Sequence, residues 1–140
     1  MRLVVDTSVL VSALRSDRGA SFRLLRLAAD RRFEMLATPA LFLEYEDVLS
    51  RVEQRSVHGM SLGEVQTMLD VLARLVVPVE VRFQWRPQLL DADDEMVLEA
   101  AMNGHADCIV TFNERRFAGV ERRLGMRVLS PRNALKEMER

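Results

Sequence analysis

The apolar run of residues 3–5 ends at a carboxylate, Asp6, which is followed by the hydroxyl side chains of Thr7 and Ser8. Burial of a carboxylate at the end of such a run costs several kcal/mol unless hydrogen bonds, a counter-ion or a metal compensate its charge. An Asp at this position is commonly the N-cap of a following helix, and it is equally suited to a functional site at the end of a strand. Both interpretations of Asp6 remain open from this segment alone.

Two further acids interrupt the apolar faces of predicted helices. Glu44 shares a helical face with Leu41 and Val48, at spacings of three and four residues. Asp94 in the same way shares a face with Leu98, four residues later. Taken alone, Glu44 is also compatible with an acid at the edge of the core that pairs with an arginine. The recurrence of carboxylates on apolar faces in separate segments favours a common functional site.

Asp94 belongs to an acidic run that extends from Asp91 to Glu95, and Asp91 lies on the same helical face as Asp94. By itself, such a run is typical of a first helical turn, where negative side chains oppose the positive end of the helix dipole. Asp91 is therefore either an additional ligand at the site or only a helix cap.

Carboxylates from three segments predict a site for a hard divalent cation, Mg²⁺ or Mn²⁺, with Asp6, Glu44 and Asp94 as ligands. Zinc is not favoured, because the chain has no convergent set of His and Cys side chains. We interpret His58 and His105 as structural or solvated. The single cysteine, Cys108, lies in a predicted buried strand and is expected to be inert.

The elements that must position these acids alternate between strands and helices. Strands are predicted in residues 2–5, 33–38, 76–81, 107–112 and 126–130. Helices are predicted in residues 9–13, 21–32, 39–52, 62–75, 91–105 and 114–125, and from residue 131 onward. In the helix of residues 21–32, the spacing predicts that Phe22, Leu25 and Ala29 face the core.

Several helices carry start or stop signals in their sequence. The start signals are Thr38 with Pro39, Ser61 with Glu64, and Ser130 with Pro131. Pro is favoured in a first helical turn, and a Ser followed three residues later by Glu forms a capping box. Gly104 is expected to close the helix that begins near residue 91.

Strands that are apolar throughout, separated by helices, predict an α/β fold with a central parallel sheet covered on both faces. Because no linker or repeat interrupts the pattern, residues 1–140 are expected to form a single domain. Ligands of such sheets bind beyond the carboxyl ends of the strands. Asp6 lies at this end of the first strand, and Asn113 follows the strand of residues 107–112.

The composition is that of an ordinary globular protein, with 29% charged residues and a formal net charge of −1. A single cysteine excludes an internal disulfide framework, and no apolar run is long enough to span a membrane. The N-terminal segment also lacks the pattern of a secretion signal. We therefore expect a cytoplasmic protein. The absence of a glycine-rich phosphate loop and of a Ser-His-Asp or Cys-His arrangement argues against a nucleotide-cofactor enzyme and a covalent hydrolase.

Four segments together resemble one family. "LVVDTSVLVSAL", "LFLEYEDVLSR", "LLDADDEMVLEAA" and "ADCIVTFNERRF" resemble, in order and spacing, the PIN-domain nucleases, and in particular the VapC-like toxins of bacterial and archaeal toxin–antitoxin modules. The likeness extends over nearly the whole chain. It implies a three-layer PIN-like fold with a central parallel β-sheet flanked by helices, and a Mg²⁺- or Mn²⁺-dependent hydrolysis of RNA.

The resemblance also implies roles for individual residues. Asp6, Glu44 and Asp94 correspond to the catalytic, metal-binding acids of the family, and Asp91 is an auxiliary acid. The polar positions expected near the substrate are Thr7, Ser8, Thr111, Arg115 and Arg116. For at least one of the two arginines, a solvated position in the first turn of a helix is the favoured interpretation.

One position departs from the family pattern. Many members carry an acid after this strand, where the present chain has Asn113, which can donate an oxygen to a metal but brings no charge. Occupancy of a second metal position is therefore in doubt. Glu114 is adjacent but is expected to turn away at the start of the next helix.

The resemblance further implies partners. They are an RNA substrate, a cognate antitoxin protein and a second copy of the chain in a homodimer or a higher homo-oligomer, with no membrane association. The amphipathic segment of residues 60–75 fits a core helix, a dimer contact or an antitoxin groove, and Trp85 fits either base stacking or ordinary packing.

Two alternative function classes compete with the nuclease interpretation. A phosphatase of the haloacid-dehalogenase type needs a second Asp two residues after Asp6, where Ser8 stands, and a receiver domain needs a downstream Lys, whereas Lys136 lies in the last helix. The remaining alternative is a non-catalytic PIN-like module that binds RNA or protein. Asn113 favours that module, and the three acids argue against it.

Overall fold

A five-stranded parallel sheet forms the centre of the protein. The computed structural model describes residues 1–51, 59–84 and 88–139. The strands are β1 (Arg2–Val5), β2 (Glu34–Ala37), β3 (Val76–Pro78), β4 (Cys108–Val110) and β5 (Arg127–Leu129). They are ordered β3-β2-β1-β4-β5, and every neighbouring pair is parallel. This arrangement confirms the predicted α/β fold with a parallel sheet.

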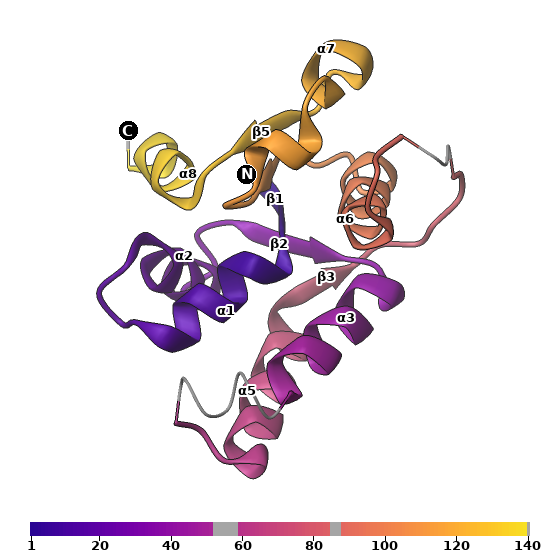
Figure 1. Cartoon of the computed structure of the whole chain (residues 1–140). Helices are drawn as coiled ribbons and strands as arrows, with labels where there is room; N and C mark the ends of the chain where they lie inside the picture. Colours follow the sequence, from indigo (N-terminus) through magenta and orange to yellow (C-terminus); the bar gives the residue numbers. More distant parts are fainter. Residues whose placement is uncertain (52–58, 85–87, 140) are drawn as a thin grey trace.

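Helices cover both faces of the sheet, so the molecule has three layers. They are α1 (Thr7–Arg15), α2 (Ala20–Ala29), α3 (Pro39–Ser50), α5 (Leu62–Leu75), α6 (Ala92–Asn103), the 3₁₀ helix η1 (Glu114–Phe117), α7 (Val120–Leu124) and α8 (Pro131–Met138). Helices α1, α2 and α8 lie on one side of the sheet and α6 on the other, while α3 and α5 pack together beside β2 and β3 (Figure 1). Within the described residues, no helix is long and apolar enough to cross a membrane.

The central strands are buried on both faces. All residues of β4 and the last three of β1 are 0% exposed. This burial explains why these strands are apolar throughout and do not alternate with polar residues. Cys108 is buried in β4, as predicted, and burial raises the pKa of its thiol to about 11.

The predicted helix starts are confirmed. The Thr38 hydroxyl accepts a hydrogen bond from the Leu41 N–H at 3.1 Å, with Pro39 as the first residue of α3. Ser61 and Glu64 form both hydrogen bonds of a capping box at the start of α5. The Ser130 hydroxyl accepts a hydrogen bond from the Asn133 N–H at 3.1 Å at the start of α8. Gly104 is the C-cap of α6, as predicted.

Two of the helix predictions were wrong in detail. In α2 the buried residues are Ser21, Leu24 and Ala28, whereas Phe22 and Leu25 are only partly buried and Ala29 is exposed. The helix is thus rotated by about one residue, because its packing against α1 and α8 decides which face is buried. That choice depends on tertiary contacts that the spacing of apolar residues does not contain.

Residues 114–125 do not form one continuous helix. Gly119 has a φ of 83°, in the left-handed region, and separates η1 from α7. Glycine adopts this conformation without the steric cost of a Cβ atom, so the chain can turn here. Strand β4 is also shorter than predicted, since it ends at Val110, before Thr111 and Phe112.

Some predictions fall outside the part of the chain that the structure describes. His58 lies within residues 52–58, and Trp85 lies within residues 85–87. His105 is described and follows the end of α6, as expected, with a φ of 51°.

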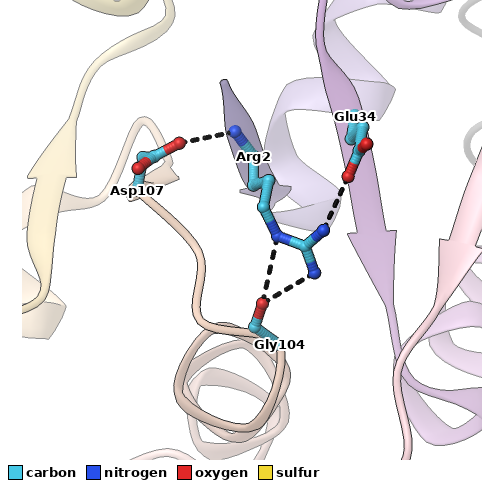
Figure 2. A network of polar contacts seen from close by, with 4 residues as sticks. All are labelled: Arg2, Glu34, Gly104 and Asp107. Atoms are coloured by element: carbon cyan, nitrogen blue, oxygen red, sulfur yellow. Dashed lines mark hydrogen bonds and ion pairs between the residues drawn. The ribbon is translucent and has the colours of Figure 1, made fainter.

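A polar network joins the amino end of the sheet to the end of α6 (Figure 2). Arg2 donates to the Gly104 carbonyl oxygen through Nε at 3.3 Å and Nη2 at 2.9 Å, and its Nη1 lies 2.7 Å from Glu34 Oε2. The Arg2 N–H donates to Asp107 Oδ2 at 2.7 Å. A cation at the last carbonyl groups of a helix is favourable, so this network holds the far end of α6 against β1 and β2.

The position of Gly104 leads to a prediction about stability. A Cβ atom there would lie 2.9 Å from the Ala100 carbonyl oxygen, from Leu36 Cδ1 and from Val79 Cγ2. We therefore expect Gly104→Ala to lower the free energy of unfolding by about 1–3 kcal/mol, because packed neighbours must shift. Urea unfolding followed by circular dichroism measures this change.

Gly63→Ala is the matched control for this substitution. Gly63 lies in α5, and the nearest atom to its added Cβ would be Ser61 Oγ at 3.9 Å. Here we expect a gain of about 0.4–1 kcal/mol, since Ala reduces the conformational freedom of the unfolded chain. Equal unfolding midpoints for the two variants would contradict the packing argument.

Candidate active site

A cleft of about 550 Å³ opens at the carboxyl end of the sheet. Its walls come from α1, α3, the start of α6 and the segment that follows β4. The residues that line it are Asp6, Thr7, Ser8, Val11, Ser12, Arg15, Glu44, Val48, Asp93, Asp94, Phe112, Asn113 and Arg116. The structure therefore brings together the three predicted acids, the predicted Asn113 and three of the five polar positions expected near a substrate.

Asp6 does not act as a helix cap through its side chain. It is the N-cap residue of α1, but its carboxylate makes no capping hydrogen bond. Instead, Asp6 Oδ2 accepts hydrogen bonds from Thr111 Oγ1 at 2.6 Å and from Ser8 Oγ at 3.0 Å. The side chain is 8% exposed. Asp6 therefore occupies the N-cap position without capping α1 through its side chain, and two hydroxyl groups hold its nearly buried carboxylate at the wall of the cleft.

Thr111 connects Asp6 to the segment after β4. Its N–H donates to the Leu129 carbonyl oxygen at 2.9 Å, and its hydroxyl oxygen accepts from the Asn113 N–H at 2.9 Å. Thr111 is 0% exposed and does not line the cleft. The structure gives it the role of orienting Asp6, in place of the predicted contact with a substrate.

Glu44 is placed by its neighbour in α3. Tyr45 is fully buried, and its hydroxyl donates a short hydrogen bond to the carbonyl oxygen of Val5, the residue before Asp6. This contact fixes α3 to the end of β1. Burial raises the pKa of Glu44, and the negative charges of Asp93 and Asp47 raise it further, while Arg51 lowers it. Asp47 forms an ion pair with Arg51 one turn later in the chain, at 2.9 Å.

Asp94 projects from the first turn of α6 and is 4% exposed. Burial raises its pKa to about 6, with further contributions from the charges of Asp91 and Asp6, and Arg116 opposes the shift. A carboxylate whose charged form is disfavoured in this way gains from any added positive charge. The cleft therefore attracts cations.

The other acids at the start of α6 have different contacts. Asp91 is the N-cap, accepting from the Asp93 N–H at 2.8 Å, and lies 3.9 Å from Arg116 Nη1. It does not line the cleft, so of the two interpretations of Asp91 the structure shows the cap. Glu95 is buried, and its Oε1 accepts from the N–H groups of Gln88 and Leu89, which ties down the chain before α6.

Sequence reasoning missed three polar residues of the cleft: Asp93, Ser12 and Arg15. For α1 a signal existed, because Ser8, Ser12 and Arg15 follow one another at helical spacings of four and three residues. Asp93 had no such signal, since it does not share the apolar face on which Asp94 lies.

The two arginines after β4 differ in position. Arg116 lines the cleft, whereas Arg115 and Glu114 are exposed and do not. Asn113 lines the cleft, and its side chain makes no capping hydrogen bond to η1. Its amide oxygen is therefore not committed to the helix.

The donor set of the cleft consists of oxygen atoms, which is the set that Mg²⁺ or Mn²⁺ prefers. Asp6, Glu44 and Asp94 line it together, and burial, with the charges of neighbouring carboxylates, raises the pKa values of Glu44 and Asp94. In residues 1–51, 59–84 and 88–139, no three His, Cys, Asp or Glu side chains are already grouped closely enough to hold a metal ion. The residues fit a divalent cation by chemistry and charge.

Comparisons with known proteins agree with this architecture. The family model of the PIN domain matches residues 2–115. Among curated proteins, none matches the chain significantly. A chain of the crystal structure of VapBC2 from Rickettsia felis, bound to a DNA fragment from their promoter, superposes with a TM-score of 0.64 and 13% identity, covering 93% of this chain and 98% of that chain. At that identity the likeness shows the fold, and the family model, which spans most of the chain, shows that this protein belongs to the PIN-domain family.

Proposed function

We propose that the protein is a metal-dependent endoribonuclease and the toxin component of a toxin–antitoxin module. The observation that carries the proposal is the convergence of Asp6, Glu44 and Asp94, from three separate elements, on one cleft at the carboxyl end of the sheet. Membership of the PIN-domain family supports the same function. The non-catalytic alternative offers no reason for nearly burying Asp6 and Asp94 beside each other.

Asp6, Glu44 and Asp94 would hold Mg²⁺ or Mn²⁺, with Asn113 as a neutral oxygen donor. When bound, such an ion supplies positive charge that activates water for attack on phosphorus and offsets the charge of the leaving oxygen. The hydroxyls of Ser8 and Thr111 keep the Asp6 carboxylate oriented, because both donate to it.

Arginine side chains can orient the phosphodiester. Arg116 lines the cleft beside the acids, and Arg15 reaches it from the last turn of α1. A guanidinium group donates two parallel hydrogen bonds to a phosphate, which fixes the orientation of the group as well as its position. The hydroxyl of Thr7, which lines the same cleft, adds a further donor.

A toxin of this kind requires a partner that blocks it. The similar Rickettsia felis chain belongs to VapBC2 bound to promoter DNA, and by analogy we propose a cognate antitoxin that covers the acidic cleft of the present chain. Exposed apolar side chains on α3 and α5, Leu43 and Leu62, provide a surface for self-association. The simplest assembly is a two-fold dimer.

The first prediction from this proposal concerns RNA cleavage. Asp6→Asn should reduce RNA cleavage by about 100-fold or more, because the variant loses an anionic ligand and keeps the shape of the side chain. Cleavage of labelled RNA with Mn²⁺, and its loss in EDTA, is the measurement. Asp70→Asn is the control, since Asp70 is an exposed acid of α5 outside the cleft.

Growth of the host cell provides a second measurement of the same prediction. Expression of the wild-type chain alone should arrest growth, and the Asp6→Asn chain should not. Full RNA cleavage by the Asp6→Asn protein would overturn the nuclease proposal. RNA binding without cleavage by the wild type in Mn²⁺ would favour the non-catalytic module.

A second prediction concerns Asn113. The neutral amide leaves one side of the cleft without the negative charge that a second cation needs. Asn113→Asp should therefore tighten binding of Mn²⁺ and lower the Mn²⁺ concentration that half-maximal cleavage requires, by about tenfold if one close charge is added. Isothermal titration calorimetry and cleavage assays across metal concentration measure both quantities.

Asn113→Ala is the companion variant. It should cost less activity than Asp6→Asn, because Asn113 contributes orientation and no charge. If Asn113→Asp binds Mn²⁺ no better than the wild type, or if Asn113→Ala is as inactive as Asp6→Asn, the role assigned to this position is wrong.

A third prediction concerns pH. The pKa of Asp94 is raised to about 6 from its ordinary value near 3.8, so the folded chain binds this proton more tightly than the unfolded chain does. Ionisation of Asp94 therefore lowers the free energy of unfolding, and this effect is complete above pH 6. It diminishes as the pH falls through 6 and is lost below about 3.8. Without divalent ions, Asp94→Asn should raise the melting temperature by about 3 °C or more at pH 7.5 and by a clearly smaller amount at pH 4.5.

Calorimetric melting of both proteins at the two pH values tests this prediction. Asp70→Asn serves again as the control and should shift the melting temperature equally little at both. An Asp94→Asn effect that is independent of pH would show that the charge of Asp94 does not strain the folded state.

A further inference from the structure

An exposed aromatic ring lies in the acidic cleft. Among residues 1–51, 59–84 and 88–139, the large apolar side chains with marked exposure are Met1, Leu43, Leu62, Val71, Leu90 and Phe112. Phe112 is the one aromatic residue in this set and the one that lines the cleft, where it is 52% exposed. A ring half in water contributes little to the core, so packing does not explain its position.

The backbone on both sides of Phe112 is anchored through Thr111, which is bonded to Asp6. The preceding residue, Thr111, donates to Asp6 at 2.6 Å and is held to Leu129 by its N–H at 2.9 Å. The following residue, Asn113, donates its N–H to the Thr111 hydroxyl at 2.9 Å. The ring is therefore attached to a fixed segment whose position is set by the same hydrogen bonds that orient Asp6.

The surroundings of the ring suit a nucleotide. On one side are the acids that would hold a metal and receive a phosphodiester, and Arg116 of the same cleft supplies a phosphate-binding cation. A phosphate and its base are joined through a sugar, so a strand whose phosphate occupies the acidic end places a base within the cleft. Aromatic side chains beside phosphate-binding cations are the usual platform for an unpaired base.

We propose that Phe112 is a positioning residue that stacks on one base of the RNA strand next to the phosphate held by the acids. The proposal rests on the nuclease function proposed above and adds to it the residue that sets the position of the strand. A ring attached to the Asp6-bound segment transmits this position directly to the reacting phosphate. The stacked base is unpaired, because a base inside a duplex already stacks on its neighbours.

The first test uses substitutions of Phe112 that distinguish the contribution of an aromatic face from that of apolar volume alone. On an RNA that the wild type cleaves, Phe112→Ala should lower kcat/KM by about 5- to 150-fold, the range of one base–aromatic stack. Phe112→Trp keeps a π-face and should retain most of the activity, whereas Phe112→Leu keeps only bulk and should lose most of it. Val71→Ala, which shortens an apolar side chain of 44% exposure on α5 outside the cleft, should leave kcat/KM unchanged.

A base-deletion scan provides the decisive test. Substrates with a single abasic nucleotide are compared at each position around the cleaved bond, with the wild type and with Phe112→Ala. At one position the abasic substrate should lower wild-type kcat/KM about as much as Phe112→Ala does, and the two changes together should cost no more than either alone. Additive losses at every position would overturn the stacking proposal.

A spectroscopic measurement reports the stack without cleavage. In the Asp6→Asn background, RNA with 2-aminopurine at the position found by the scan should change its fluorescence on binding, and Phe112→Ala should abolish this change. The same fluorescence change with Phe112→Ala would overturn the proposal. So would full activity of Phe112→Leu, because apolar bulk without a π-face would then be sufficient at this position.

Failure of this inference differs from failure of the proposed function. If the wild type cleaves no RNA in Mn²⁺, the proposed nuclease function and the stacking role of Phe112 are both wrong. If the wild type cleaves RNA and Phe112→Ala is as active as the wild type, the nuclease assignment stands and only the role of Phe112 is wrong.

Discussion

The nearly buried carboxylate of Asp6 is the constraint on which the site depends. A charged group in this environment is tolerated only where hydrogen bonds replace its water, and here the hydroxyls of Ser8 and Thr111 do so from two different elements. Ser8 lies in α1 and Thr111 follows β4, so satisfying one charge determines how α1 and the end of β4 sit beside β1. The Asp6 N–H adds a bond to the Val110 carbonyl oxygen at 2.9 Å. Asp6 therefore links the pairing of β1 and β4 to the position of α1 through the hydrogen bonds of its carboxylate and its N–H.

The same end of β1 also positions the second acid. The hydroxyl of Tyr45 needs an acceptor because the ring is fully buried, and it finds one in the Val5 carbonyl oxygen. Glu44 is the residue before Tyr45 in α3, so the hydrogen bond that fixes α3 also fixes the position of Glu44. The third acid comes with α6, whose two ends are fixed separately: Glu95 anchors the chain that enters the helix, and Arg2 binds the carbonyl of Gly104 at its end. Separate sets of anchoring contacts thus bring the three carboxylates to one cleft.

Local sequence patterns account for part of this fold and of this site, and tertiary contacts account for the rest. The parallel sheet, the capping residues and the three acids could be predicted, because each depends on a local pattern: apolar runs, Ser or Thr before a helix, and an acid on an apolar face. The buried face of α2 could not, because its contacts with α1 and α8 are tertiary. The position of Asp93 in the cleft could not be predicted either, since a first-turn acid that caps a helix and one that faces a cleft look alike in sequence. Thr111 was predicted at the right place but for a different contact, since whether a hydroxyl faces a ligand or a neighbouring carboxylate depends on burial.

The cleft also combines two opposed requirements. Its acids attract cations and for the same reason repel the phosphates of RNA, and the chain as a whole has a net charge of −1, which gives no long-range attraction. Under the proposed function, substrate binding then depends on cations that neutralise the cleft, on Arg116 and Arg15 at its walls, and on contacts that carry no charge. A phosphate contact weakens as salt is raised, whereas stacking on an aromatic ring depends on apolar and π-face contact and is screened far less. An exposed phenylalanine beside the acids is therefore a physically consistent way to hold a polyanion at a negatively charged site.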